Sequence, residues 1–173
     1  MIRKCHMAKL ALEKDRSAIE ADAAAHGPIP PEFRQTLTSD APAVVLWGTG
    51  TPRREFLHVD DLAAACRFVM ELPEAEYRTH TDPMQTHINV GVGEDVTIRE
   101  LAELVRQAVG YEGDVIWDQS KPDGTPRKLL DVSLLKKMGW EARIQLKEGI
   151  ADTYAQYRRR ANRMDLNQNI QDV

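Results

Sequence analysis

The sequence predicts an α/β domain in which short strands alternate with about five helices. Short apolar runs end in turns rich in glycine and proline, and stretches with an apolar residue at every third or fourth position follow them. Apolar residues make up 42% of the 173-residue chain and charged residues 29%, which is the balance of a folded domain and not of a disordered chain. This length is enough to bury one modest hydrophobic core.

Residues 1–42 are predicted to form an N-terminal helix followed by an inserted, proline-rich loop. Residues 1–25 are rich in Ala, Glu and Lys, which favour helix. The sequence His-Gly-Pro at 26–28 and the prolines that follow it are expected to end this helix. A polar stretch then runs to Pro42.

The next strands and helix are predicted from short apolar runs. Residues 43–47 (AVVLW) and 55–59 (EFLHV) are each predicted to form a strand. Asp60 stands where the N-cap of a helix is expected, and apolar spacing predicts that helix over 61–72. Residues 73–86 are predicted to form a loop.

A strand, a helix and another strand are predicted in the second half of the chain. Residues 87–91 (HINVG) and 114–118 (DVIWD) are the strands. Thr97 and Glu100 have the spacing of a capping box, which predicts a helix start, and Gly110 is expected to end that helix.

Two further helices complete the predicted order of elements. A short helix is expected over 131–139. The last helix carries an apolar face through Leu146, Ile150 and Tyr154. Residues 161–173 lose this apolar spacing and are expected to form a frayed C-terminal tail.

Charge and cysteine content restrict the partners and the compartment. With 23 Lys and Arg against 27 Asp and Glu, the net charge of −4 provides no general basic surface for nucleic acid or an anionic membrane. No apolar run approaches the roughly 20 residues that span a bilayer. Cys5 and Cys66 show no C-x-x-C spacing, and two isolated thiols suit a reducing compartment, so we expect a cytoplasmic protein.

One turn sequence occurs twice. Gly-Thr-Pro-Arg stands at 50–53, followed by Arg54, and again at 124–127, followed by Lys128. Proline fixes φ and glycine tolerates unusual backbone angles, so each turn can hold its cations in a set direction. A planar guanidinium and a compact ammonium suit the oxygens of a diphosphate. The alternative is a solvated turn whose cations face water or pair with nearby carboxylates such as Glu55 and Asp131.

Three side chains next to these turns are candidates for ligand contacts. Trp47 ends an apolar strand and either stacks on a planar base or belongs to the core. Asp118 and Asp123 flank the second turn. They either bond ribose hydroxyls and purine N–H groups or cap the turn.

Two other patterns are weaker evidence for a functional site. Gly-Val-Gly at 91–93 lacks the third glycine of a dinucleotide-binding loop, and the acidic pair at 94–95 would repel a pyrophosphate. His58, Asp60 and Asp61 suggest a metal cluster, but a structural use is favoured because Asp60 is needed as a cap. No nucleophile elbow is present and no tyrosine has a lysine four residues later, so no complete catalytic set is predicted.

Four segments resemble, in this order, the C-terminal part of the GDP-L-fucose synthase family of extended short-chain dehydrogenase/reductases. They are VVLWGTGTPRREFLHVDDLA, HINVGVGEDVTIRELAELV, VIWDQSKPDGTPRKLLDVSLL and GWEARIQLKEGIADTY. The resemblance covers about residues 43–157 and extends to residues 1–8. The two segments that contain the repeated turn are more specific than a general epimerase pattern.

The resemblance implies binding of a GDP-sugar. Enzymes of this family convert GDP-4-keto-6-deoxy-D-mannose to GDP-L-fucose by 3,5-epimerisation and NADPH-dependent 4-reduction. By resemblance, Arg54 and Lys128 clamp the substrate diphosphate, Lys4 is a third basic position, and Trp47 and Asp123 line the GDP-sugar site.

The resemblance also implies what the chain lacks. The family's catalytic Ser, Tyr and Lys and its glycine-rich NADP loop belong to a Rossmann domain expected ahead of Met1. We therefore expect residues 43–160 to be a substrate-binding α/β lobe without most of the Rossmann domain. No catalytic residue and no metal ligand is assigned, and the isolated chain is expected to be inactive. The full-length family forms homodimers, and about 30 residues between Lys4 and the Trp47 strand are an insertion relative to it.

Two alternatives remain open at this point. The chain is either part of an epimerase or dehydratase of the same superfamily that acts on another nucleotide sugar, or a non-catalytic remnant that serves as an interaction module. A nucleotide panel in a thermal-shift assay distinguishes these alternatives. Stabilisation of the chain by a nucleotide other than GDP would favour the first, and stabilisation by no nucleotide would favour the second.

Overall fold

The computed structural model describes residues 1–39, 41–84 and 87–171, with side chains through Arg160. These residues form eight helices and five short strands. The helices are α1 (Ile2–Leu12), α2 (Arg16–His26), α3 (Pro31–Leu37), α4 (Val59–Glu71), α5 (Glu74–His80), α6 (Ile98–Val109), α7 (Ser133–Lys137) and α8 (Leu146–Gln171). The strands are β1 (Val44–Trp47), β2 (Arg53–Arg54), β3 (Val96–Thr97), β4 (Val115–Asp118) and β5 (Arg127–Lys128). The predicted α/β class is confirmed.

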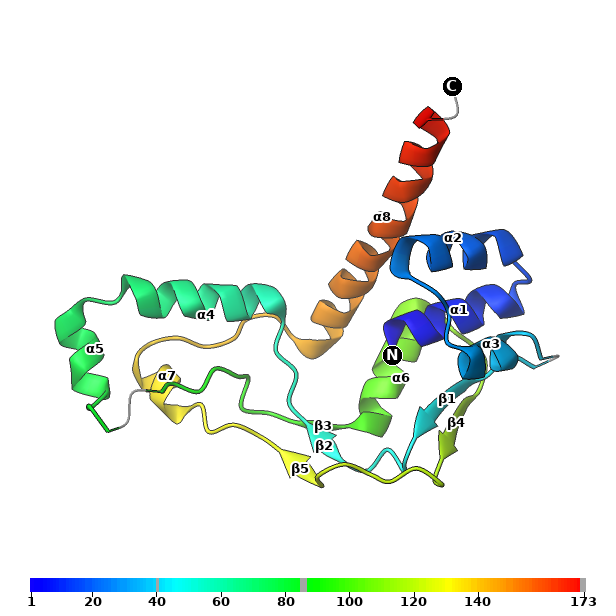
Figure 1. Ribbon diagram of the computed structural model, residues 1–173. Coiled ribbons are helices and arrows are strands. Elements are labelled where there is room, and N and C mark those ends of the chain that lie inside the picture. The colour runs from blue at the N-terminus through cyan, green and yellow to red at the C-terminus, as the bar shows by residue number, and fades with distance from the viewer. Residues whose placement is uncertain (40, 85–86, 172–173) are drawn as a thin grey trace.

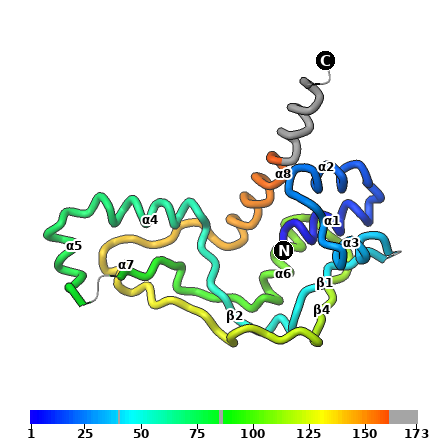
Figure 2. The backbone as a smooth tube through the Cα atoms, viewed as in Figure 1, coloured from blue at the N-terminus to red at the C-terminus, as the bar shows by residue number. Residues whose placement is uncertain are grey.

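The strands form two small sheets. β1 and β4 pair in parallel from Val44 opposite Val115 to Trp47 opposite Asp118, which confirms the strands predicted at 43–47 and 114–118. The second sheet has the order β3-β2-β5, with β2 antiparallel to β3 and parallel to β5. The chain therefore passes twice from the first sheet to the second, once from β1 to β2 and once from β4 to β5 (Figure 1). Figure 2 shows the first of these passages as a smooth backbone tube.

The core lies at one end of the molecule. α1 packs on α2, α3, α6 and β1, and α8 packs on α2 and α6 (Figure 1). Met7, Val44 and Tyr111 are fully buried there. The Tyr111 hydroxyl donates to the carbonyl oxygens of Pro42 (2.9 Å) and Asp114 (3.1 Å), which ties together the chain segments that lead into β1 and β4. α4 and α5 project from this core toward the opposite end (Figure 1).

The predicted capping signals of α6 are confirmed. The Thr97 hydroxyl accepts the Glu100 N–H, and the Glu100 carboxylate accepts the Thr97 N–H, at 3.0 and 2.7 Å. Gly110 ends the helix at a φ of 69°, in the left-handed region that glycine adopts without a steric penalty. Local sequence thus fixes both ends of this helix.

The prediction for the first 42 residues was wrong in two respects. The expected single helix is divided into α1 and α2, because Lys14 has a φ of 59° and the Asp15 carboxylate accepts the Ala18 N–H as the N-cap of α2. The expected proline-rich loop contains α3, which begins at Pro31 and buries Phe33 and Leu37. A proline in the first turn loses no hydrogen bond, so it starts this helix.

The predictions around α4 also need correction. The expected strand at 55–59 is not formed, since the pairing residues are those of β2. The N-cap of α4 is His58 and not Asp60, because the His58 side chain accepts the Asp60 N–H. α5 lies within the predicted loop and begins at Glu74, with Pro73 as its N-cap residue.

The predicted strand at 87–91 is also wrong. Residues 87–91 pair with no strand among the described residues, and the antiparallel partner of β2 is β3. An apolar run forms a strand only where a partner accepts its hydrogen bonds.

The predicted short and final helices are present. α7 falls within the range 131–139, and α8 continues the apolar face that begins at Leu146. The side chains beyond Arg160, and residues 172 and 173 altogether, lie outside the described residues, so the frayed tail remains a prediction. Within the described part, none of the helices is both long enough and apolar enough to cross a bilayer.

Candidate functional site

The two copies of the repeated turn lie next to each other. β2 and β5 pair in parallel, so Arg53 stands opposite Arg127 and Arg54 opposite Lys128. The Arg53 N–H donates to the carbonyl oxygen of Pro126 at 2.8 Å, which joins one turn directly to the other. The structure therefore brings together two cationic pairs that are far apart in the sequence.

Arg53 and Arg127 form the inner pair, which binds one carboxylate. Asp95 Oδ1 accepts from Arg53 Nε at 2.7 Å, and Asp95 Oδ2 accepts from Arg127 Nε at 2.5 Å. The Asp95 side chain is only 3% exposed. Its pKa lies below the ordinary value because Arg127, and after it Arg53, donates a hydrogen bond to the charged form.

Arg54 and Lys128 form the outer pair. Successive side chains of a strand point to opposite faces of the sheet, and directly opposite residues share a face, so the register places this pair away from the inner one. Arg54 Nη1 donates to the Arg53 carbonyl oxygen at 2.6 Å. Among the described residues, no carboxylate pairs with Arg54 or Lys128.

Glycine in the second turn leaves room for the Arg54 guanidinium. A Cβ on Gly124 would lie 3.1 Å from Arg54 Nη2, tighter than an ordinary van der Waals contact. Arg54 also lines a hollow of about 80 Å³, whose other lining residues include Phe56, Glu94 and Asp95. Arg54 is half-buried and Lys128 is exposed.

The sequence analysis left open that the cations of the turns pair with Glu55 and Asp131. For the inner pair, this alternative is wrong. The Glu55 carboxylate accepts the N–H groups of Val92 and Gly93, each at 2.6 Å, and that of Leu130 at 3.2 Å. Asp131 accepts the N–H of Ser133, the first residue of α7, at 2.9 Å. Both carboxylates bind backbone groups instead of the arginines.

Asp123 joins the two turns at their other end. Its Oδ1 accepts the Thr49 N–H at 2.9 Å and its Oδ2 accepts the Thr49 hydroxyl at 2.6 Å. The Thr49 side chain, and after it the Thr49 backbone, lowers the pKa of Asp123. Asp118 has the turn-capping role that was one of its two alternatives, because it accepts the N–H and hydroxyl of Ser120.

The two tryptophans of the parallel sheet have different surroundings. Trp47 is 68% exposed, with Lys121 Nζ 5.8 Å from its ring centre, so its alternative as a core residue is wrong. Trp117, which the sequence analysis missed, supports the first turn. Its ring lies against Gly50, where a Cβ would come within 2.6 Å, and the Arg99 guanidinium stacks 4.6 Å from its centre.

Lys4 lies on the β1 side of the molecule. Its ammonium donates to the Val45 carbonyl oxygen at 3.0 Å and lies 5.9 Å from the Phe33 ring centre. The contacts of Lys4 therefore connect α1 to β1 and not to the outer pair.

The group around His58 has structural contacts. His58 Nδ1 accepts the Asp60 N–H at 3.3 Å, and His58 Nε2 lies 3.4 Å from Asp152 Oδ2. The buried Asp61 accepts the N–H groups of Arg143 and Ile144 at 3.0 and 2.8 Å. These contacts fix the start of α4 to α8 and to the segment before it. The ligand atoms of His58, Asp60 and Asp152 lie within 4.8 Å of one another, so the structural use of this group remains a prediction.

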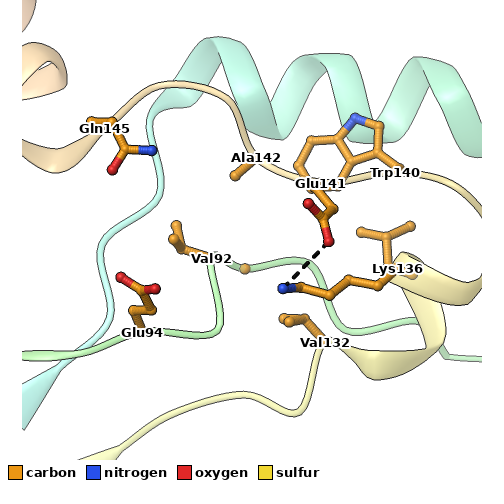
Figure 3. A pocket seen from close by; sticks show the side chains of 10 residues that line it. Val92, Glu94, Val132, Lys136, Trp140, Glu141, Ala142 and Gln145 are labelled. Carbon is orange, nitrogen blue, oxygen red and sulfur yellow. Dashed lines mark ion pairs between the residues drawn. The ribbon is translucent and has the colours of Figure 1, made fainter.

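A separate cavity of about 160 Å³ lies between residues 91–94, α7 and residues 140–145 (Figure 3). Lys136 and Glu141 face each other across it, with 3.5 Å between Nζ and Oε1. None of the five predicted binding residues lines it.

Comparison with known proteins shows which sequences and folds this chain resembles. Residues 23–91 match the NAD dependent epimerase/dehydratase family. A GDP-6-OMe-4-keto-L-xylo-heptose reductase from C. jejuni has a similar structure, with a TM-score of 0.75 and 34% identity over 91% of this chain and 46% of that one. A GDP-mannoheptose C4 reductase from Campylobacter jejuni, with NADP bound, matches with a TM-score of 0.69 and 34% identity over 91% of this chain and 43% of that one.

The curated relatives are more specific. The GDP-L-fucose synthase of Escherichia coli (strain K12) is 57% identical over 122 residues, which are 70% of this chain and 38% of that enzyme. The probable GDP-L-fucose synthase 1 of Oryza sativa subsp. japonica is 52% identical over 125 residues, or 72% of this chain and 35% of that protein. The chain is therefore similar over part of its length to the NAD dependent epimerase/dehydratase family and over about 70% of its length to GDP-L-fucose synthases. It spans little more than a third of the length of these curated relatives.

Proposed function

We propose that this chain is the GDP-sugar-binding part of a GDP-L-fucose synthase, the enzyme that converts GDP-4-keto-6-deoxy-D-mannose to GDP-L-fucose by 3,5-epimerisation and NADPH-dependent 4-reduction. The observation that supports this most is the outer pair. Arg54 and Lys128 are neighbours on adjacent strands, and no carboxylate in the described part of the chain neutralises them. The relatives named above act, by their names, on GDP-linked sugars.

The outer pair matches a diphosphate in spacing and in charge. Neighbouring strands lie about 4.8 Å apart, so one cation can contact each of two linked phosphoryl groups. A guanidinium binds phosphate oxygens as a planar fork and an ammonium binds them as a point charge. The mutual repulsion of Arg54 and Lys128 also decreases when an anion lies between them.

The remaining predicted residues have supporting places in this proposal. The exposed Trp47 ring presents a flat apolar surface on which a base or sugar can stack. Asp123 holds the two turns together through Thr49 and so orients the site from its far end. Lys4 contributes a third charge only if its ammonium leaves the Val45 carbonyl oxygen.

The described residues do not fit the family's cofactor, NADP(H). A pyrophosphate would need the N–H groups that follow Gly91, and those of Val92 and Gly93 are already bonded to Glu55. We therefore assign NADP(H) binding to the part of the relatives' length that this chain does not match. The homodimeric assembly and the cytoplasmic location belong to the same proposal, the first by resemblance and the second from the isolated cysteines.

Calorimetric titration with GDP tests the role of the outer pair. Arg54→Ala and Lys128→Ala should each weaken binding about tenfold or more, because a hydrogen bond to a charged group contributes about 1.5–3 kcal/mol. Arg34→Ala on α3 and Lys147→Ala on α8 are matched controls, since both are exposed cations on other elements, and they should leave the affinity unchanged. Equal affinities for all four variants and the wild type would disprove the assignment.

A nucleotide panel in a thermal-shift assay tests the base. We expect GDP to raise the melting temperature more than UDP or dTDP does. A preference for UDP or dTDP would point to another nucleotide sugar, and no shift with any nucleotide would favour a non-catalytic interaction module.

A further inference from the structure

We propose that Asp95 is a positioning residue for this diphosphate site: it holds the inner arginines of both turns and thereby keeps Arg54 and Lys128 side by side toward the ligand. This inference rests on the proposed function, because it assigns a role in the same site. Asp95 itself does not touch the ligand.

The first argument is geometric. Asp95 immediately precedes β3, on one side of β2, whereas β5 lies on the other side. One oxygen of the Asp95 carboxylate binds Arg53 on β2 and the other binds Arg127 on β5. Its backbone carbonyl oxygen also accepts from Arg53 Nη2 at 2.7 Å. One residue thus connects all three strands of the sheet.

The second argument concerns the length of the strands. β2, β3 and β5 each contain two residues, so their ladders supply few hydrogen bonds to fix the register. Such a small sheet has little stability of its own. The bridge through the Asp95 side chain therefore adds two side-chain hydrogen bonds to the few ladder bonds that hold Arg54 opposite Lys128.

The third argument is electrostatic. Like charges directly opposite each other on neighbouring strands are destabilising, and β2 and β5 place two such cationic pairs in adjacent positions. Asp95 lies between the two inner arginines and offsets one of their two positive charges. Among the described residues, the one other carboxylate that pairs with an inner arginine is that of Glu100, which lies 4.0 Å from Arg53 Nη1 and is engaged in the α6 cap. The outer pair is left for an external anion.

The proposal gives a reason for the repeated turn. Each copy supplies one arginine to a shared internal carboxylate and one following cation to the ligand side. A turn with a single cation could either be anchored in this way or bind the ligand, but not both.

The test is a double-mutant cycle by calorimetric titration with GDP. Asp95→Asn keeps the size of the side chain, removes its charge, and should weaken GDP binding about tenfold. If Asp95 acts through Arg54, the double variant Asp95→Asn/Arg54→Ala should bind no more weakly than Arg54→Ala alone. Glu103→Gln is the matched control, because it breaks a Glu–Arg pair on α6 and should leave the affinity unchanged.

The outcomes separate the two proposals. Failure of the wild type to bind GDP, or wild-type affinity in Arg54→Ala, overturns the proposed function itself. If Arg54→Ala weakens binding but Asp95→Asn does not, or if the two effects simply add, the positioning role of Asp95 is wrong. If Asp95→Asn is unfolded at the titration temperature, Arg127→Ala takes its place, because it removes one of the two arginines that Asp95 binds. The double variant Arg127→Ala/Lys128→Ala should then bind GDP no more weakly than Lys128→Ala alone.

Discussion

Three acidic residues organise the polar region around the turns by using both oxygens of their carboxylates. Asp95 connects two arginines, Asp123 binds the backbone and side chain of Thr49, and Glu55 binds the amides of two separate segments. Because each carboxylate joins groups that are distant in sequence, these residues hold the loops in place where little apolar surface is buried. These carboxylates and the arginines that Asp95 binds therefore have a structural role, whereas Arg54 and Lys128 remain available to bind a ligand.

Gly50 provides a test at the scale of one residue. Its φ is 76° and a Cβ there would come within 2.6 Å of the Trp117 ring. Gly50→Ala should destabilise the fold by about 1–2 kcal/mol from the backbone alone, and further through the collision with the ring. Gly139→Ala is the matched control, because its φ is 97° with no atom within 4 Å of the added Cβ. Urea unfolding should show the larger loss for Gly50→Ala, and equal losses would contradict the contact with Trp117.

The elements that could be predicted from sequence are those with local signals. β1 and β4 are continuous apolar runs, and α6 has a capping box at one end and a glycine at the other. α3 was missed because the prolines at its start were read as helix breakers, and α5 lies in a stretch that was predicted to be a loop. β2 and β5 carry only cations, with no apolar alternation, so their pairing depends on tertiary contacts that no local pattern reveals.

The candidate site could be predicted only in part, because some of its residues carry a local sequence signal and others do not. The repetition of the turn suggested that Arg54 and Lys128 act together, and the register of β2 and β5 makes them neighbours. Asp95 was read only as a charge that would repel a pyrophosphate, because nothing near it in the sequence indicates that two distant arginines bind it. Trp117 was likewise treated as an ordinary strand residue.

The three-stranded sheet gives a prediction for pH dependence. The pKa of Asp95 in the folded chain lies below its ordinary value of 3.8, because Arg127 and Arg53 stabilise the charged form. A depressed folded-state pKa contributes stability above the unfolded-state value, and this contribution is lost as the pH falls through the folded-state pKa. The free energy of unfolding should therefore fall less between pH 6 and pH 2 in Asp95→Asn than in the wild type. If urea unfolding gives the same pH dependence of the free energy of unfolding for the wild type and Asp95→Asn, the stabilising bridge through Asp95 is contradicted.

At the scale of the whole molecule, packing is uneven. The helices around β1 and β4 share one core, whereas α4 projects away from it with Val59 65% and Met70 84% exposed (Figure 1). Next to the start of α4 lies a largely apolar cavity of about 500 Å³, lined among others by Phe56, Leu101 and Ile150. The chain spans 38% of the length of its Escherichia coli relative.

The most direct test of the central claim is a crystal structure of this chain with GDP. The account predicts that the diphosphate lies against β2 and β5, with its oxygens within about 2.7–3.2 Å of both the Arg54 guanidinium and the Lys128 ammonium. It also predicts that Asp95 stays bonded to Arg53 and Arg127 in the complex. A diphosphate that contacts only one of the two outer cations, or that binds elsewhere on the molecule, would contradict it.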